Sequence, residues 1–147
     1  MILLDKKNVK LEFEPDIPCI TMISLGYMSS EEFREPFLIG LDFMEEKINE
    51  MPDISWLNDT RKQKTAKLED VKWINSNVNE RAYKMGVKKV AFVLPESAFG
   101  KLVIQSYVKI TNSRIDNKLT IKAFKTVEKA KDWLKSKDGI STDEVKI

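Results

Sequence analysis

The segment Ile54-Ser55-Trp56-Leu57-Asn58-Asp59-Thr60-Arg61 decides the fold, because a short apolar run ends there in a polar turn and a basic loop. Apolar side chains fall on both faces of the run, at Ile54, Trp56 and Leu57, as expected for a parallel sheet with helices on both sides. We therefore expect residues 54–58 to form a central strand. Ligands and partners of such sheets bind where strands leave the carboxyl edge, so the exit of this strand is the first candidate site.

An antiparallel pair of strands is expected before this segment. Residues 8–14 alternate apolar and polar side chains, which is the pattern of a half-buried strand. Residues 19–25 return as a β-rich run after a turn that contains two prolines. Residues 2–4 add a short apolar segment in front of the pair.

A long amphipathic helix is expected between this pair and the central strand. Ser29 and Glu32 fit a capping box at its start, and apolar residues then recur on one face to about Glu50. Pro36 lies inside the expected helix, where it lacks an N–H group and its ring crowds the preceding turn. We therefore expect Pro36 to kink the helix or to split off its first turn.

Helix and strand patterns alternate after the central strand. Apolar residues recur at helical spacing over residues 68–85, and Gly86 suits a left-handed C-terminal cap. Ser97 is expected to cap a further helix. The other expected elements are strands at 88–94 and 119–124, helices at 98–111 and 127–134, and a polar turn at 112–118.

This order of elements predicts an α/β fold. The expected architecture is a single mixed β-sheet, antiparallel at its N-terminal strands and parallel in the following β-α-β units, with four helices. A chain of 147 residues fits one domain. We expect that domain to cover residues 1–136 and residues 137–147 to form a frayed C-terminal tail.

The composition predicts a cytoplasmic protein without membrane contact. Hydrophobic residues make up 42% and charged residues 33% of the chain, as in ordinary globular proteins. No apolar run approaches the roughly 20 residues needed to span a bilayer, and the N-terminus lacks the pattern of a signal peptide. Cys19 is the single cysteine, so an internal disulfide is excluded, and we expect this thiol to be buried.

Enzyme activity is not expected from these residues. The chain has no histidine, which excludes the zinc sites, catalytic triads and phosphotransfer that need an imidazole. Tyr27, Asp59 and Glu96 are expected at strand ends, but no neighbouring group that would shift their pKa values is evident. Residues 95–101 lack the full phosphate-loop pattern. We expect no catalytic residue, no metal and no cofactor.

The charge is unevenly distributed, with a net charge of −7 over residues 1–53 and +9 over residues 54–147. Four basic residues gather in the loop after the central strand, just ahead of an expected helix: Arg61, Lys62, Lys64 and Lys67. Cations and unpaired N–H groups could together hold a phosphate or carboxylate there, so this loop is the best anion candidate. A solvated loop is the alternative.

Nucleic-acid binding is not expected at this loop, because no aromatic residue is interleaved with its cations. Trp73 is the nearest aromatic residue and lies slightly off the apolar face of its helix. We consider two interpretations of Trp73. It lines a pocket or an interface, or it is a partly exposed core residue.

The order of elements over about residues 8–136 resembles the STAS domain of anti-sigma-factor antagonists and sulfate-transporter tails, and more narrowly its SpoIIAA-like branch of small stand-alone proteins. The resemblance implies a SpoIIAA-like fold and a regulatory role that is carried out by binding other proteins. The most specific pieces are Leu25-Gly26 before a serine-capped helix, the Trp56 to Arg61 exit, the strand at 90–95, and the closing residues Phe124, Ala130 and Trp133-Leu134.

In antagonists of this family, the loop after the corresponding strand carries an Asp-Ser-Ser-Gly-like motif whose serine is phosphorylated to control binding to an anti-sigma kinase. Asp59 matches the acidic residue, and Thr60 stands at the position of the hydroxyl. The following glycine is missing, and the loop is longer and basic. Thr60 or Thr65 is therefore either a regulatory phosphosite or a neutral surface hydroxyl.

We expect a non-catalytic regulatory or protein-interaction module of STAS-like type. The expected partner is a protein, and a homodimer is compatible with the sequence. The alternative is a small-molecule binding protein that holds a lipid or an anionic ligand between sheet and helices. The candidate binding residues are Asp59, Thr60, Arg61, Lys62, Lys64 and Trp73.

Overall fold

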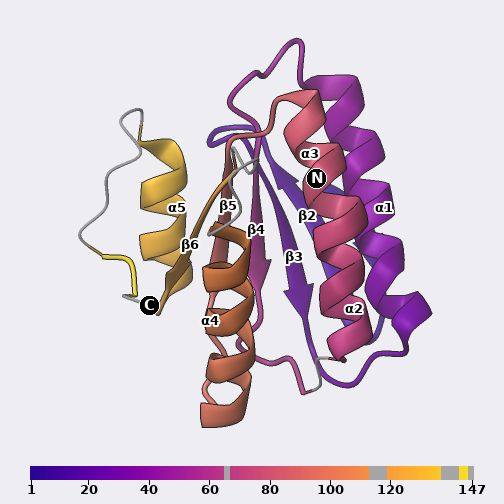
Figure 1. The fold of residues 1–147 in the computed structure, drawn as a ribbon. Helices are drawn as coiled ribbons and strands as arrows, with labels where there is room; N and C mark the ends of the chain where they lie inside the picture. Colours follow the sequence, from indigo (N-terminus) through magenta and orange to yellow (C-terminus); the bar gives the residue numbers. More distant parts are fainter. Residues whose placement is uncertain (65–66, 113–118, 137–142, 146–147) are drawn as a thin grey trace.

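The computed structural model describes residues 1–64, 67–112, 119–136 and 143–145 (Figure 1). Within these residues, six strands form one sheet in the order β1-β2-β3-β4-β5-β6. β1, β2 and β3 pair antiparallel, and β3 to β6 pair parallel, which confirms the mixed sheet. The strands are β1 (Ile2–Asp5), β2 (Val9–Glu14), β3 (Cys19–Ser24), β4 (Ser55–Asp59), β5 (Lys89–Val93) and β6 (Thr120–Phe124).

The helices occupy the expected places between and after the parallel strands. α2, η1 and α3 follow one another without a break, so they form one helical segment with a π-helical turn at its centre. The π turn was not predicted. The helices in the described part of the chain are α1 (Ser30–Lys47), α2 (Leu68–Trp73), η1 (Ile74–Val78), α3 (Asn79–Met85), α4 (Ala98–Asn112) and α5 (Val127–Lys135).

Two helical layers cover the sheet unequally (Figure 1). Each parallel strand is added on the same side of the one before it, so right-handed crossovers place the connecting helices on one face. α1, the α2 to α3 segment and α4 share the larger core on that face. α5 follows the last strand and packs on the opposite face against β4, β5 and β6, with a smaller core that includes Leu57 and Trp133.

β4 lies between β3 and β5, and its five residues are all buried. Side chains alternate between the faces of a strand. Trp56 belongs to the core under α1 and α3, while Leu57 belongs to the core under α5. The two-sided burial expected for the central strand is therefore confirmed, with a shift of one residue in its bounds.

The N-terminus of α1 has both halves of the expected capping box. The Glu32 amide donates to Ser29 Oγ at 3.1 Å, and the Ser29 amide donates to Glu32 Oε1 at 3.1 Å. Of the two outcomes expected at Pro36, a kink or a separate first turn, the separate turn is wrong, because α1 runs through this residue as one helix. The ring of Pro36 is buried, and its burial together with the cap offsets the one hydrogen bond that proline cannot make.

Two further helix ends agree with the sequence. Gly86 ends α3 with a φ of 106°, in the left-handed region that favours glycine. The Gly100 amide donates to Ser97 Oγ at 3.0 Å, which is the expected cap of α4. Cys19 is buried as expected, and burial raises the pKa of its thiol to about 11. Among the described residues, no helix combines the length and the apolar character that a membrane span requires.

Gly40 allows α1 to lie directly on β4. A Cβ atom at this position would lie 2.2 Å from Cζ3 and 2.4 Å from Cη2 of the Trp56 ring. The same ring stacks on Phe37, one turn earlier in α1, with a centroid distance of 5.5 Å. The indole therefore lies in direct contact with α1, and there is no room for a larger residue at position 40.

We predict that Gly40→Ala lowers the free energy of unfolding by about 2–3 kcal/mol, because overpacking must displace the Trp56 ring or the helix. Leu38→Ala, an exposed position in the same helix, is the control and should change stability by less than about 0.5 kcal/mol. Urea unfolding followed by tryptophan fluorescence measures both. Equal stabilities for the two variants would contradict the close contact.

Candidate functional site

The predicted site residues at the end of β4 do not all point the same way. Asn58, Asp59 and Thr60 are buried, and successive side chains of a strand point to opposite faces. Asn58 and Thr60 line a pocket on the face covered by α1, α2 and α4. Asp59 lies on the α5 face. The exit of β4 therefore supplies two separate polar groups rather than one cluster.

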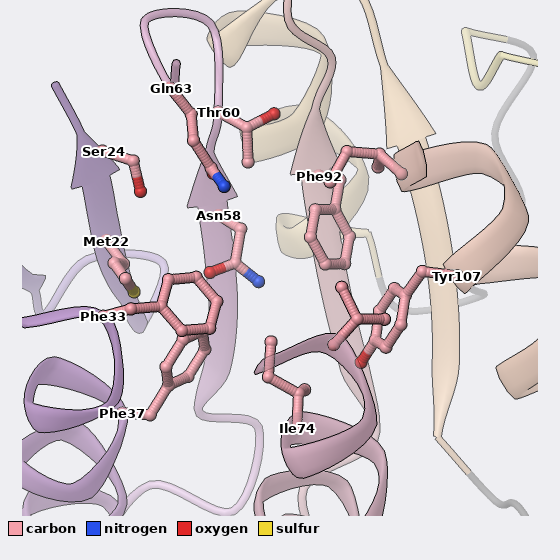
Figure 2. Close-up of a pocket in the computed structure, with 12 residues that line it drawn as sticks. Met22, Ser24, Phe33, Phe37, Asn58, Thr60, Gln63, Ile74, Phe92 and Tyr107 are labelled. Atoms are coloured by element: carbon pink, nitrogen blue, oxygen red, sulfur yellow. The ribbon is translucent and has the colours of Figure 1, made fainter. Parts of the chain in front are cut away.

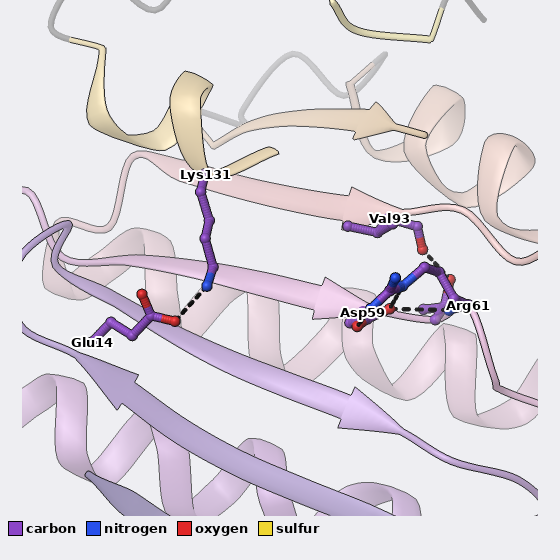
Figure 3. Close-up of polar contacts among 6 residues, drawn as sticks. Glu14, Asp59, Arg61, Val93 and Lys131 are labelled. Atoms are coloured by element: carbon purple, nitrogen blue, oxygen red, sulfur yellow. Dashed lines mark hydrogen bonds and ion pairs between the residues drawn. The ribbon is translucent and has the colours of Figure 1, made fainter. Parts of the chain in front are cut away.

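Asp59 is engaged by Arg61, two residues later (Figure 3). Arg61 Nε donates to Asp59 Oδ1 at 2.9 Å, and Arg61 Nη2 donates to Oδ2 at 2.8 Å. The carboxylate is only 6% exposed, while the guanidinium side chain is 49% exposed. This hydrogen bonding is the largest cause of the raised pKa of Arg61. Arg61 thus serves to neutralise a buried carboxylate, and its charge is already compensated.

Thr60 is also fully engaged. Its Oγ1 donates to the Val93 carbonyl of β5 at 2.6 Å, and its amide donates to the same oxygen at 3.1 Å. The residue is 4% exposed, so a kinase could reach the hydroxyl only after this part of the sheet opened. The geometry disfavours Thr60 as a phosphate acceptor. Thr65, the other candidate, lies outside the described residues.

We predict that Arg61→Ala lowers the free energy of unfolding by about 1–2 kcal/mol, because it leaves the Asp59 carboxylate buried without its partner. The half-exposed position of the guanidinium keeps the effect below that of a fully buried pair. Lys62→Ala, next in the chain and exposed, should change stability by less than about 0.5 kcal/mol. Chemical unfolding of both variants tests this, and an unaffected Arg61→Ala would show that the pair does not stabilise the exit.

The cations after Arg61 are exposed. Lys62, Lys64 and Lys67 extend into solvent, and Lys67 precedes α2 without making a side-chain cap. The Lys64 amide donates to the Gly26 carbonyl at 3.2 Å, which fixes the loop beside the β3 to α1 turn. That turn carries Tyr27, and α2 begins with another exposed apolar residue. We call the set Tyr27, Lys62, Lys64 and Leu68 the exit surface; Tyr27 is 68% and Leu68 is 69% exposed.

Trp73 belongs to the contact between α1 and α2. Its ring meets the edge of Phe37 at a centroid distance of 6.2 Å, and the Arg34 guanidinium lies 5.1 Å above the ring. Arg34 Nε also donates to the buried Asp70 at 3.1 Å. The ring is partly exposed, which agrees with the second interpretation of this residue, and Arg34 covers it.

A pocket lies between the sheet and the helices, beneath the exit of β4 (Figure 2). Its free volume is about 30 Å³, enough for one water molecule. Asn58 Oδ1 accepts a hydrogen bond from Trp56 Nε1 at 2.8 Å. The lining has no charged side chain and includes Ser24, Phe33, Asn58, Ile74, Phe92 and Tyr107.

Tyr107 and Thr111 tie α4 to the start of α3 and to the π-helical turn before it. Asn79 Nδ2 donates to Tyr107 Oη at 2.6 Å, and Thr111 Oγ1 donates to Asn75 Oδ1 at 2.9 Å. Burial raises the pKa of Tyr107 to about 12, so its hydroxyl stays protonated at neutral pH. This network was not predicted from the sequence. The spacing of Asn75 and Asn79, one helical turn apart, is the signal that could have indicated it.

The described residues contain no group of three or more histidine, cysteine, aspartate or glutamate side chains that could hold a metal ion. The polar groups at the exit of β4 are instead paired with one another or with the backbone. What remains available there for contact with another molecule is the exit surface and the small uncharged pocket beneath it.

No protein-family model matches the chain, and no curated protein is similar to it at a significant level. The structure is similar to the crystal structure of an uncharacterised protein of the DUF3478 family, with a SpoIIAA-like fold, from Shewanella loihica PV-4. The TM-score is 0.56, and the match covers 86% of this chain and 91% of the other at 16% sequence identity. The chain therefore has a SpoIIAA-like α/β fold.

Proposed function

We propose that this protein is a non-catalytic interaction module that binds an acidic protein partner through the exit surface. The observation that supports this most directly is the exposure of Tyr27 and Leu68 beside two lysines on a base of buried, fully bonded residues. A rigid base lowers the entropy lost on binding, and exposed apolar side chains gain most when a partner covers them.

The chemistry of the exit surface favours a protein over other partners. Tyrosine is enriched at protein interfaces, where its ring supplies contact area and its hydroxyl a hydrogen bond. Lys62 and Lys64 are exposed, and their positive charge would steer an acidic surface toward the site. Single-stranded nucleic acid would need several aromatic side chains as a stacking platform, and Tyr27 is the one aromatic member of the exit surface.

A non-catalytic role is supported by how the titratable groups near the exit are used. The Asp59 carboxylate is bound to Arg61, and the Tyr107 hydroxyl accepts from Asn79. Both groups are therefore engaged in contacts within the fold. The alternative, a carrier of lipid or anionic ligands, has no comparable support, because the pocket holds about one water and has no cation in its lining.

Charge reversal at Lys62→Glu/Lys64→Glu tests the proposal, because both side chains are exposed and neither pairs with the buried Asp59. Affinity capture from an extract of the native host, with quantitative mass spectrometry, should show at least about a tenfold loss of the retained partner. Lys88→Glu/Lys109→Glu is the matched control. It reverses the charge of two exposed lysines, one directly before β5 and one in the last turn of α4, and should retain the partner.

Tyr27→Ala should weaken the same interaction without changing the net charge of the surface. The proposal would be contradicted if no protein were enriched over resin without bait. It would equally be contradicted if the exit-surface variant and the matched control retained the same proteins to the same extent.

A further inference from the structure

The outer edge of β6 is occupied by residues of the chain itself. β6 is the last strand of the sheet, so one side of it has no neighbouring strand among the described residues. Asn112 Nδ2 donates to the Ile121 carbonyl at 2.9 Å, and the Val145 amide donates to the Ala123 carbonyl at 2.6 Å. The described residues 143–145 thus approach the end of β6 from the far end of the chain (Figure 1).

Two side chains of residues 143–145 also contact the sheet. Glu144 Oε1 lies 3.2 Å from Lys122 Nζ, and the two side chains are only 23% and 17% exposed. Lys122 Nζ in turn lies 5.4 Å from the centre of the Trp133 ring, on the α5 face. Val145 packs against the larger core, on the opposite face. Successive side chains therefore point to opposite faces, as they do in an extended strand.

The contacts of residues 143–145 indicate which features of an extended segment fit the outer edge of β6. An unpaired strand edge is a template for another extended segment, and folded proteins cover such edges. Strand addition gains affinity from the backbone and specificity from alternate side chains. Here the backbone contact is the Ala123 carbonyl, the polar contact is the Lys122 ammonium, and the apolar contact accepts a branched residue such as Val145.

We propose that the outer edge of β6 is a docking site for an extended segment of a partner protein in which an acidic residue precedes a branched apolar one. Glu144 and Val145 fill this site in cis and hold it closed. A tethered segment competes at a high effective concentration, so a partner binds appreciably only when residues 143–145 are displaced. This site is separate from the exit surface and does not depend on the proposed function.

The test uses the full chain and a fluorescein-labelled peptide of residues 141–147, Ser-Thr-Asp-Glu-Val-Lys-Ile, followed by fluorescence anisotropy. In Glu144→Lys/Val145→Asp, the cis segment loses both its ion pair and its apolar contact. This variant should bind the peptide at least about tenfold more tightly than the wild type does. A control peptide with Lys for Glu and Asp for Val should not bind.

Glu46→Lys/Leu38→Asp makes the same kinds of change at two exposed positions of α1, which packs near β1 and β2 at the other side of the sheet, and should bind the peptide as the wild type does. Thermal unfolding establishes that the variants are folded, and Glu144→Lys alone replaces the double variant if that one unfolds. We call Glu144→Lys/Val145→Asp the released variant. In its NMR spectra, the peptide should shift the amide signals of Lys122 and Ala123 rather than those of Lys62 and Lys64.

Equal peptide affinity in the released variant and the wild type would overturn the competition in cis. Absence of binding by the released variant would overturn the docking site itself, as would shifts confined to the exit surface. Loss of partner capture through the exit surface has no bearing on these outcomes, because the peptide test measures binding at Lys122 and Ala123 and uses no residue of the exit surface.

Discussion

The pairing of Asp59 with Arg61 is the interaction on which the candidate site depends. β4 is buried on both faces, so the polar residues at its end are shielded from water although they directly precede the turn. An isolated carboxylate in that position would be strongly destabilising. The guanidinium of Arg61, two residues later, offsets the cost of burying the Asp59 charge through two hydrogen bonds. Thr60 bonds to β5 at the same level, so the turn after β4 is fixed on both faces of the sheet.

This constraint explains which residues at the end of β4 stabilise the fold and which are left exposed for contact with a partner. Residues whose polar groups are bonded inside the fold cannot also serve a ligand, which leaves the side chains beyond Arg61 for contact with a partner. The Lys64 amide bond to Gly26 joins the loop to the turn that carries Tyr27. Burial of β4 thereby determines where the exposed lysines and Tyr27 lie, although none of them belongs to the core.

Local patterns in the sequence predicted most of the fold because each acts over a few residues. Ser29 with Glu32 marked a helix start, and Gly86 marked a helix end. Features that depend on distant residues were missed, such as the π turn, whose Asn75 accepts a hydrogen bond from Thr111 in α4. At the site, alternation along β4 could have separated Asp59 from Thr60, but the pairing of each residue could not be derived without the positions of β5 and the loop.

Amide hydrogen exchange at the exit of β4 is the most direct test of the claim that this turn is held rigidly. The Thr60 amide donates to the Val93 carbonyl, so it should exchange about as slowly as the amide of Leu57 in the middle of the strand. The Lys62 amide, in the exposed loop, should exchange at least about 100-fold faster. Rapid exchange at Thr60, at a rate similar to that of Lys62, would contradict the account.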